Sequence, residues 1–453
     1  MLFNFKSKKI IFAILILLSI LIFYAFWNVV SGGYDRQNKA ILFLKKIIPN
    51  KISRKVRDTI FVIPDLKERN KQLSLQVEKY EQSFDGKLFN KKIYISDNDQ
   101  KYALKEFFLP FHRLDIRLGW AATENSLRAH YLEIVKDKVL VISGKGQTIY
   151  FEKKNIFKDK LLQKDIPNNI SNLLMKNKYK LIGIRDLFVE DDKVYISIQH
   201  KDENGFTINL YESDLNFEKL NFKPFFKINE YWPVYNVYSG GRIETFKDNK
   251  ILFSIGYSDV KNAAQDKKSF LGKIIAIDKT TKNYEIISIG NRNPQGLFYA
   301  KNRNLVINTE HGPKGGDEIN FNYLENKEIP NFGWDIASYG TTYSGKKIYK
   351  DSHAKFGFVE PFKYFTPSIG ISEIVYLPGT QTLDKKETLF VSSLRAASVY
   401  IIKMNDEMNK IISEDRLYFP EQRLRHIEYD KENNVFFIMF ENTPSIGILE
   451  VKP

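Results

Sequence analysis

The chain has 453 residues, no cysteine and a formal net charge of +15. These values allow one large domain with additional segments and exclude disulfides and thiolate metal sites. Residues 1–105 carry 20 Lys and Arg against 9 Asp and Glu, so most of the positive charge lies there. A basic stretch beside an apolar segment favours contact with anionic lipid headgroups. Nucleic-acid binding is the rival interpretation, but no basic recognition motif is present, so we expect no nucleic-acid partner.

The first expected elements are a basic segment at residues 1–9 and a transmembrane helix at 10–30. Residues 10–30 are apolar apart from Ser19 and Asn28 and carry no charge. At 1.5 Å per residue this run is about 31 Å long, enough to cross a bilayer core. A cleavable signal peptide is the alternative, but it has a shorter apolar run and a small-residue cleavage site. We therefore expect an uncleaved single-pass anchor.

Residues 31–105 are expected to form a basic stalk or linker. Within it, residues 64–80 read as a polar helix that Asp65 can cap, with a thin apolar stripe. The simplest interpretation is a spacer, and the alternative is a short helix for self-association. Basic residues follow the apolar segment as well as precede it, so the charge rule does not choose the orientation of the anchor.

Residues 106–453 are expected to be all-β. A turn rich in Asp, Asn, Lys and Gly recurs before a short alternating strand at 137–143, 192–198, 249–255, 304–308, 387–392 and 434–439. Most of these starts lie about 45–60 residues apart, as in four-stranded blades. The longer gap between the fourth and the fifth indicates a loop insertion near 321–365. Six units predict a six-bladed β-propeller, with an array of β-sandwiches as the alternative.

Three motifs lie close together in the fourth unit. They are Gly290-Asn-Arg-Asn-Pro-Gln-Gly-Leu297, Glu310-His-Gly-Pro-Lys-Gly-Gly-Asp-Glu-Ile-Asn320 and Asn331-Phe-Gly-Trp334. Their order and spacing resemble the glucose/sorbosone dehydrogenase family, sugar-oxidising β-propellers that use pyrroloquinoline quinone (PQQ). The resemblance implies a propeller, a sugar substrate, PQQ and Ca²⁺ as cofactors, and a body on the periplasmic or other extracytoplasmic side of the membrane.

The resemblance also implies a set of cofactor-binding residues. In the family the Arg-Asn of the first motif contacts PQQ, which corresponds to Arg292 and Asn293. Arg395 stands where the family has a basic residue, typically Lys, and Arg423 and Arg425 match an R-x-R strand. Residues i and i+2 of a strand face the same side, and guanidinium groups suit the carboxylates of PQQ. An exposed basic face is the alternative interpretation of these arginines.

A metal site is implied at the second motif. The family holds an active-site Ca²⁺ partly through the Gly-Pro carbonyls, which correspond to Gly312 and Pro313. Asp317 and Glu318 follow, either as ligands of a second cation or, as we favour, as acceptors for loop amides. Trp334 is expected to pack within a blade. The other histidines show no metal-ligand spacing.

The catalytic base departs from the family pattern. Residues 239–242 and 253–256 match a family run, but Tyr238 stands at the catalytic His and Tyr257 at the Asp that orients it. Tyrosine has an unperturbed pKa near 10, so it needs a nearby cation, such as Arg242 or Ca²⁺, to act as a base at neutral pH. His311 is a third candidate for a catalytic role.

Three functions are compatible with these residues. The first is a membrane-anchored PQQ- and Ca²⁺-dependent aldose dehydrogenase with an altered base. The second is a non-catalytic propeller that binds a sugar, a polyanion or a protein. The third, a Ca²⁺-dependent lactonase-type hydrolase, needs several converging carboxylates, whereas these motifs are richer in arginine.

Overall fold

The computed structural model describes residues 19, 86–113, 129–382 and 384–452. The predicted basic segment, nearly all of the predicted anchor at 10–30 and the stalk up to residue 85, including its predicted helix, lie outside these residues. None of the helices formed by the described residues has the length and apolar character needed to span a bilayer. Residues 81–453 form one compact unit.

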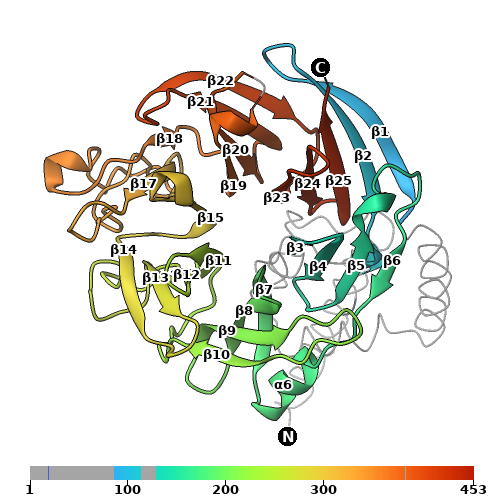
Figure 1. Cartoon of the computed structure of the whole chain (residues 1–453). Coiled ribbons are helices and arrows are strands. Elements are labelled where there is room, and N and C mark those ends of the chain that lie inside the picture. The colour runs from blue at the N-terminus through green and yellow to red at the C-terminus, as the bar shows by residue number, and fades with distance from the viewer. Residues whose placement is uncertain (1–18, 20–85, 114–128, 383, 453) are drawn as a thin grey trace, which may run out of the picture. The chain divides into compact units, whose positions relative to one another are not determined.

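Six antiparallel sheets are arranged as blades around a common axis (Figure 1), which confirms the predicted six-bladed β-propeller, and the inner strands of this fold line its central channel. Within the described residues, five sheets have four strands and the sixth has five. The six strands predicted from their alternation are the second strands of the six blades. The irregular segment between 324 and 362 lies inside the fourth blade, where the insertion was predicted.

The blades are built in chain order from the channel outward. The first three blades comprise β3 (His130–Val135), β4 (Lys138–Ser143), β5 (Thr148–Glu152) and β6 (Gln163–Asp165); β7 (Lys180–Glu190), β8 (Lys193–Lys201), β9 (Phe206–Asp214) and β10 (Lys223–Lys227); and β11 (Gly240–Phe246), β12 (Lys250–Ile255), β13 (Lys273–Asp278) and β14 (Tyr284–Ile289).

The last three comprise β15 (Pro294–Ala300), β16 (Leu305–Glu310), β17 (Asp317–Tyr323) and β18 (Lys363–Phe365); β19 (Ile371–Leu377), β20 (Glu387–Ser393), β21 (Ser398–Met404) and β22 (Ile411–Tyr418); and β23 (Leu424–Asp430), β24 (Val435–Phe440) and β25 (Ser445–Val451) with β2 (Lys101–Phe108) and β1 (Leu88–Ile95) outside them.

The few helices formed by the described residues are short and lie between strands. They are α6 (Ile170–Lys176) and the 3₁₀ turns η1 (Pro110–Arg113), η3 (Lys153–Asn155), η4 (Lys301–Arg303), η5 (Ala354–Phe356) and η6 (Gly379–Gln381).

Polar turns at the first hairpin of each blade explain the repeated Asp and Asn residues of the sequence. Asp191 and Asp192 have φ of 50° and 55°, and Asp248 and Asn249 have φ of 57° and 59°. Two successive positive φ values define the turn that matches the twist of a β-hairpin, and Asp and Asn tolerate them better than most residues. The turn chemistry therefore sets where each inner strand ends.

The sixth blade joins the two ends of the described chain. Strand β2 pairs with β25 along its whole length, from Tyr102 opposite Val451 to Phe108 opposite Ser445. The predicted domain boundary at residue 106 falls inside β2, so the propeller begins about 18 residues earlier than predicted, at β1. The reason for the difference is physical: a ring of blades closes when an edge strand is paired, and this pairing joins residues far apart in sequence.

The apolar core lies between neighbouring blades. In one cluster, Ile208 and Leu210 of β9 pack with Ile251 and Phe253 of β12 and with Ile275 of β13, and all five side chains are fully buried. Burial of each such side chain stabilises the fold by about 1.5–3 kcal/mol. Each blade is thus held by both of its neighbours, which gives the loops at the channel ends a rigid support.

The six inner strands β3, β7, β11, β15, β19 and β23 surround the channel (Figure 1). Their first residues meet at one end, where Gly240 N donates to Asn293 Oδ1 at 3.2 Å and Arg425 Nη1 donates to Gln295 Oε1 at 2.8 Å. The second halves of all six line a cavity at the other end. We call these ends the N-terminal mouth and the C-terminal mouth.

Candidate functional site

A buried carboxyl group shapes the loop before β15. Glu310 Oε2 accepts hydrogen bonds from the backbone amides of Arg292 at 3.0 Å and Asn293 at 2.8 Å. Burial raises the pKa of Glu310 to about 8, although these two amides and Arg292 oppose that rise. Glu310 therefore fixes the backbone of the Arg-Asn pair at the N-terminal mouth and is largely protonated at neutral pH.

The Arg292 guanidinium lies among three aromatic rings. Its carbon is 4.4 Å from the centre of the Tyr238 ring, 5.1 Å from Trp334 and 5.8 Å from Tyr257. Its Nη1 donates to the carbonyl of His311 at 2.6 Å, and its Nε has no hydrogen-bond partner among the described residues. Cation–π contacts of this kind hold a guanidinium in place and leave donors available. Trp334, predicted only to pack, is thus a wall of the site.

The two tyrosines at the catalytic positions do not ionise readily. Their rings stack with centres 5.8 Å apart. Burial raises the pKa of Tyr238, and the neighbouring Arg292 opposes this rise. Burial also raises the pKa of Tyr257, whose hydroxyl donates to Asp259 Oδ1 at 2.6 Å, far above its usual value. Both side chains are neutral phenols at neutral pH, so neither is prepared to act as a base.

Arg242 does not have the place that we considered for it beside Tyr238. Its Nη1 lies 2.7 Å from Asp186 Oδ1, and its Nη2 pairs with Glu373 and contacts His426 Nδ1 at 2.9 Å. Residues i and i+2 of a strand share one face, and Arg242 and Glu244 of β11 both line the cavity at the C-terminal mouth. The cation beside Tyr238 is therefore Arg292.

A chain of hydrogen bonds joins three blades at the N-terminal mouth. Asn293 Oδ1 accepts from Gly240 N and from Gln295 Nε2 at 3.1 Å, and Gln295 Oε1 accepts from Arg425 Nη1. Arg425 in turn binds Glu441 Oε1 through its Nε at 2.6 Å. The structure thus brings Asn293 and Arg425 together from separate motifs.

Arg423 and Arg425 share one buried carboxylate. Arg423 Nε binds Glu441 Oε2 at 2.9 Å, parallel to the Arg425 bond. Burial alone would raise the pKa of Glu441, but the two arginines lower it to about 2. Both guanidinium groups donate to Glu441 through Nε, so Glu441 orients them. Terminal guanidinium nitrogens of the two arginines are left for a ligand. Glu441 also supplies part of the negative charge that the arginines require.

The pKa of His311 is affected by all three arginines of this mouth. Burial lowers its pKa to about 4; Asp317 opposes this, whereas Arg425, Arg292 and Arg423 lower it further. The imidazole is consequently neutral at neutral pH. Among the three predicted catalytic residues, His311 alone is in its proton-accepting form under those conditions.

The loop that carries Gly312 and Pro313 is held by Asp317. Its Oδ1 accepts from Gly312 N at 3.1 Å, and its Oδ2 accepts from Gly370 N at 2.7 Å and Ile371 N at 3.0 Å. This confirms the expected role of Asp317 as an acceptor for loop amides. Pro313 O already accepts from Gly316 N and from Ser368 Oγ, at 3.2 and 3.0 Å.

The structure provides limited support for a metal at this loop. Within residues 86–113, 129–382 and 384–452, no group of three or more His, Asp or Glu side chains has the geometry of a metal site. A site built from backbone carbonyls does not require such a group. Of the two predicted carbonyl ligands, Pro313 would have to share its oxygen with two donors.

Arg395 lies beside Gly370, whose backbone amide donates to Asp317 Oδ2, because a Cβ at Gly370 would lie 3.0 Å from the Cβ of Arg395. It lies in the turn between β20 and β21 and its side chain is exposed, and its backbone amide donates to Ile369 O at 3.0 Å. No ion pair in the described part of the chain joins Arg395 to the cluster around His311. The predicted cofactor contact of Arg395 remains a prediction.

Sequence reasoning missed four residues that organise this mouth. Glu310, Gln295 and Glu441 are described above, and the fourth is Arg185 on β7, whose Nε donates to Gln199 Oε1 at 2.9 Å. Gly241 makes room for it, because a Cβ at Gly241 would lie 2.4 Å from the Cβ of Arg185. The only sequence signal for Arg185 and Glu441 was a charged residue inside or directly after an apolar run, at 181–189 and 435–440.

The chain matches the sequence model of the glucose/sorbosone dehydrogenase family over residues 180–446. An uncharacterised protein of Synechocystis sp. is 26% identical over 293 residues, covering 59% of this chain and 69% of that protein. Aldose sugar dehydrogenase YliI of Escherichia coli is 26% identical over 229 residues, covering 47% of this chain and 60% of the relative, which is less than two thirds of it.

Among solved structures, the PQQ-bound aldose sugar dehydrogenase of Streptomyces coelicolor has a TM-score of 0.52 at 17% identity. The match covers 78% of this chain and 99% of that one. This likeness shows the same propeller fold.

Proposed function

Because the chain belongs to the glucose/sorbosone dehydrogenase family, of which it is a divergent member, we propose that its N-terminal mouth binds PQQ and oxidises an aldose. The observation that carries this proposal is the group of three arginines at this mouth: Arg292 donates to the His311 carbonyl, and Arg423 and Arg425 share Glu441. Glu441 is shared by two of these arginines, and Glu310 is largely protonated. The mouth therefore keeps excess positive charge for an anionic ligand.

The residues present fit a tricarboxylated, planar cofactor. Arg423 and Arg425 offer terminal nitrogens to carboxylates, and the unpartnered Nε of Arg292 is a third donor. The side-chain amide of Asn293 is fixed beside them by Gly240 and Gln295. PQQ, when bound, supplies the acceptor for a hydride from the sugar carbon.

The base in this proposal is His311. Oxidation of a sugar hydroxyl requires a group that accepts the hydroxyl proton while a hydride leaves the carbon that bears this hydroxyl. His311 is neutral at neutral pH, whereas Tyr238 and Tyr257 retain their protons. The low pKa of His311 makes it a weak base, which predicts slower turnover than a histidine of ordinary pKa would give.

Further parts of the proposal rest on resemblance. The Gly312 and Pro313 carbonyls are the proposed Ca²⁺ ligands, where the ion would polarise a bound carbonyl group. We also propose that residues 10–30 anchor the protein in a membrane with the propeller on the extracytoplasmic side. The stalk from residue 31 is the proposed place of any self-association.

One observation favours a non-catalytic binding propeller as the second candidate. The two rings at the family's catalytic positions hold Arg292 and are themselves protonated. If His311 does not accept a proton, the mouth is left as a rigid, positively charged binding site. A sugar acid, a polyanion or an acidic protein segment would be its ligand.

Titration of the full-length protein with PQQ, with and without Ca²⁺, tests the proposal. We expect binding at micromolar PQQ and bleaching of the quinone absorbance when an aldose is added. Binding without bleaching by any aldose would support the second candidate. Absence of PQQ binding under both conditions would contradict the dehydrogenase proposal.

A further inference from the structure

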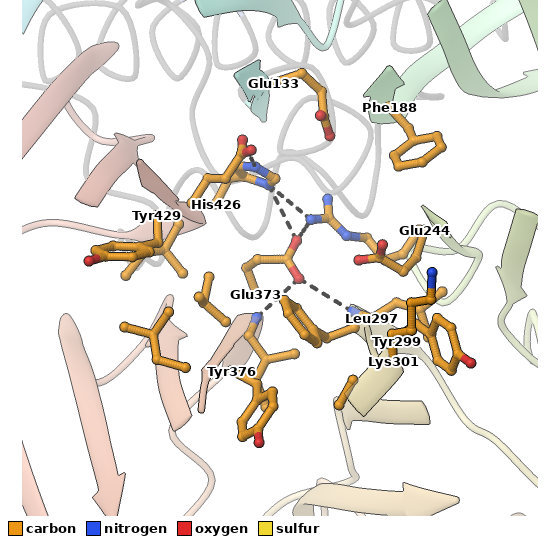
Figure 2. A pocket seen from close by; sticks show the side chains of 18 of the residues that line it. Glu133, Phe188, Glu244, Leu297, Tyr299, Lys301, Glu373, Tyr376, His426 and Tyr429 are labelled. Atoms are coloured by element: carbon orange, nitrogen blue, oxygen red, sulfur yellow. Dashed lines mark hydrogen bonds and ion pairs between the residues drawn. The ribbon is translucent and has the colours of Figure 1, made fainter. Parts of the chain in front are cut away.

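The C-terminal mouth contains a cavity of about 840 Å³ that the proposed dehydrogenase site does not use (Figure 2). All six inner strands contribute to its wall. Five carboxyl side chains line it: Glu133, Asp186, Glu244, Glu373 and Glu428.

The carboxyl groups of this cavity outnumber the cations beside them. Arg242 pairs with Asp186 and Glu373, as described above. Glu133, Glu244 and Glu428 form no ion pair with a lysine or arginine among the described residues. Lys301 and Lys431 line the cavity but are exposed to solvent. Three carboxyl groups from three blades thus face one space without a cation between them.

Apart from the atoms of the Arg242 ion pairs, two buried polar atoms at the cavity wall lack hydrogen-bond partners among the described residues. They are His426 Nε2 and Glu428 Oε2, which lie 3.9 Å apart. The His426 side chain is only 6% exposed. Burial and Arg242 lower its pKa, so the ring is neutral and does not neutralise Glu428. Unpartnered buried polar atoms are costly, and here they indicate a missing ligand.

The rest of the wall is apolar and aromatic. Figure 2 shows the side chains of Phe188, Leu297, Tyr299, Tyr376 and Tyr429 around the carboxyl groups. The described carboxyl groups do not have the geometry of a metal site. Carboxylates among aromatic rings in a cavity of this size match the recognition of an organic ammonium ion.

We infer that this cavity binds an organic cation: an amine whose ammonium group pairs with Glu133, Glu244 and Glu428 while its apolar part packs against the aromatic wall. The protonation of the cavity agrees with this. Burial, together with the neighbouring carboxyl groups, raises the pKa of Glu244 and of Glu428 to about 8, and that of Glu133 well above its usual value. A bound cation would restore the ionised forms, so binding would release protons and tighten between about pH 6 and pH 9.

The test is calorimetric titration of the full-length protein with benzylamine, using benzyl alcohol as the neutral match and CaCl₂ as the metal probe. We expect benzylamine to bind, benzyl alcohol to bind much more weakly, and the measured heat to vary with the buffer because protons are released. Glu244→Gln and Glu428→Gln each remove one charge with little change of shape and should weaken binding roughly 10- to 100-fold. Glu325→Gln, an exposed control, should leave binding unchanged.

Three outcomes would overturn the inference. One is no binding of benzylamine at about 10 mM, a concentration at which a fitting ligand of this size should saturate the site. Another is equal binding of benzyl alcohol. The third is binding that Glu244→Gln and Glu428→Gln leave unaltered although both variants melt as the parent does. If Ca²⁺ binds more strongly than the amine, and Glu244→Gln and Glu428→Gln abolish that binding, the ligand of the cavity is a metal ion and the inference is overturned.

Discussion

Tyr238 and Tyr257 stand at the positions where the family resemblance places a catalytic His and its orienting Asp. In this chain they form two sides of an aromatic box that holds the Arg292 guanidinium. Burial keeps both hydroxyl groups protonated. The two tyrosines therefore position a cation and are not prepared to accept a proton. His311 is then the remaining candidate for the base.

The role of the Tyr238 ring can be separated from that of its hydroxyl group. Tyr238→Phe should leave PQQ affinity and sugar oxidation within about threefold of the parent, because the ring face over Arg292 remains. Tyr238→Ala should weaken PQQ binding by about tenfold, since a cation–π contact contributes about 0.5–2 kcal/mol. PQQ titration and dye-coupled kinetics measure both. Loss of turnover in Tyr238→Phe with normal PQQ binding would restore the tyrosine as the base.

Glu441 offers a second test at the same scale. Glu441→Gln removes the charge that orients Arg423 and Arg425, so both guanidinium groups lose a charged hydrogen-bond partner. We expect PQQ affinity to fall roughly 10- to 100-fold, in line with about 1.5–3 kcal/mol for hydrogen bonds to charged groups. Equilibrium titration gives the value. Tighter PQQ binding in this variant would mean that Glu441 mainly neutralises the arginines and does not orient them.

The pH profile identifies the base. If His311 accepts the proton, kcat/KM should fall on the acid side with a midpoint near pH 4, because the ring is protonated below its lowered pKa. His311→Gln should reduce kcat by about 10²–10⁴-fold while PQQ still binds. A rate that is negligible at neutral pH and rises only above about pH 10, the ordinary tyrosine value, would assign the base to a tyrosine, because burial raises the pKa of both rings.

At the scale of elements, the ring closure is the feature with the largest practical consequence. β2 pairs with β25, and β1 pairs with the other edge of β2. The sixth blade therefore needs residues from both ends of the propeller. The insertion between β17 and β18 is the second such feature, because it places Trp334 against Arg292. Both connect residues that no local pattern relates.

This closure predicts where the chain can be shortened. A protein that begins at residue 106 lacks β1 and most of β2, so the edge of β25 is left unpaired and exposed. We expect it to aggregate or to melt well below the parent. A protein that begins at residue 81 retains the compact unit and should melt cooperatively. Circular dichroism and size-exclusion chromatography compare the two, and equal stability would show that the closure contributes little.

At the scale of the whole molecule, the channel has basic side chains at one mouth and carboxyl side chains at the other. Arginines gather at the N-terminal mouth and carboxyl groups at the C-terminal mouth, with the buried cluster of Arg242, Asp186 and Glu373 below the first and beside the second. The two ends are therefore suited to ligands of opposite sign, an arrangement that six converging strands make possible.

The carboxyl groups of the C-terminal mouth make the stability of the folded protein depend on pH. The pKa values of Glu244 and Glu428 are about 8 in the folded state, above the unfolded value of 4.5, so the folded protein binds more protons between these pH values. Their contribution to stability is full below about pH 4.5 and is lost as pH rises towards 8. Glu244→Gln should therefore raise the melting temperature at pH 8 by roughly 2–4 °C and change it little at pH 5. Thermal melts of parent, Glu244→Gln and Glu325→Gln check this, and an equal shift at both pH values would exclude the linkage.

The sequence by itself determined the propeller, its six second strands, the insertion in the fourth blade, and the motifs around Arg292, His311, Arg423 and Arg425. These follow from periodicity, turn chemistry and short motifs, which are local. Tertiary structure alone decided that β1 and β2 close the ring, that Glu310 and Glu441 hold the arginine-bearing segments, and that Arg242 faces the acidic mouth. The reason is that pairing partners, burial and pKa values depend on residues up to several hundred positions apart, which only the folded chain brings into contact.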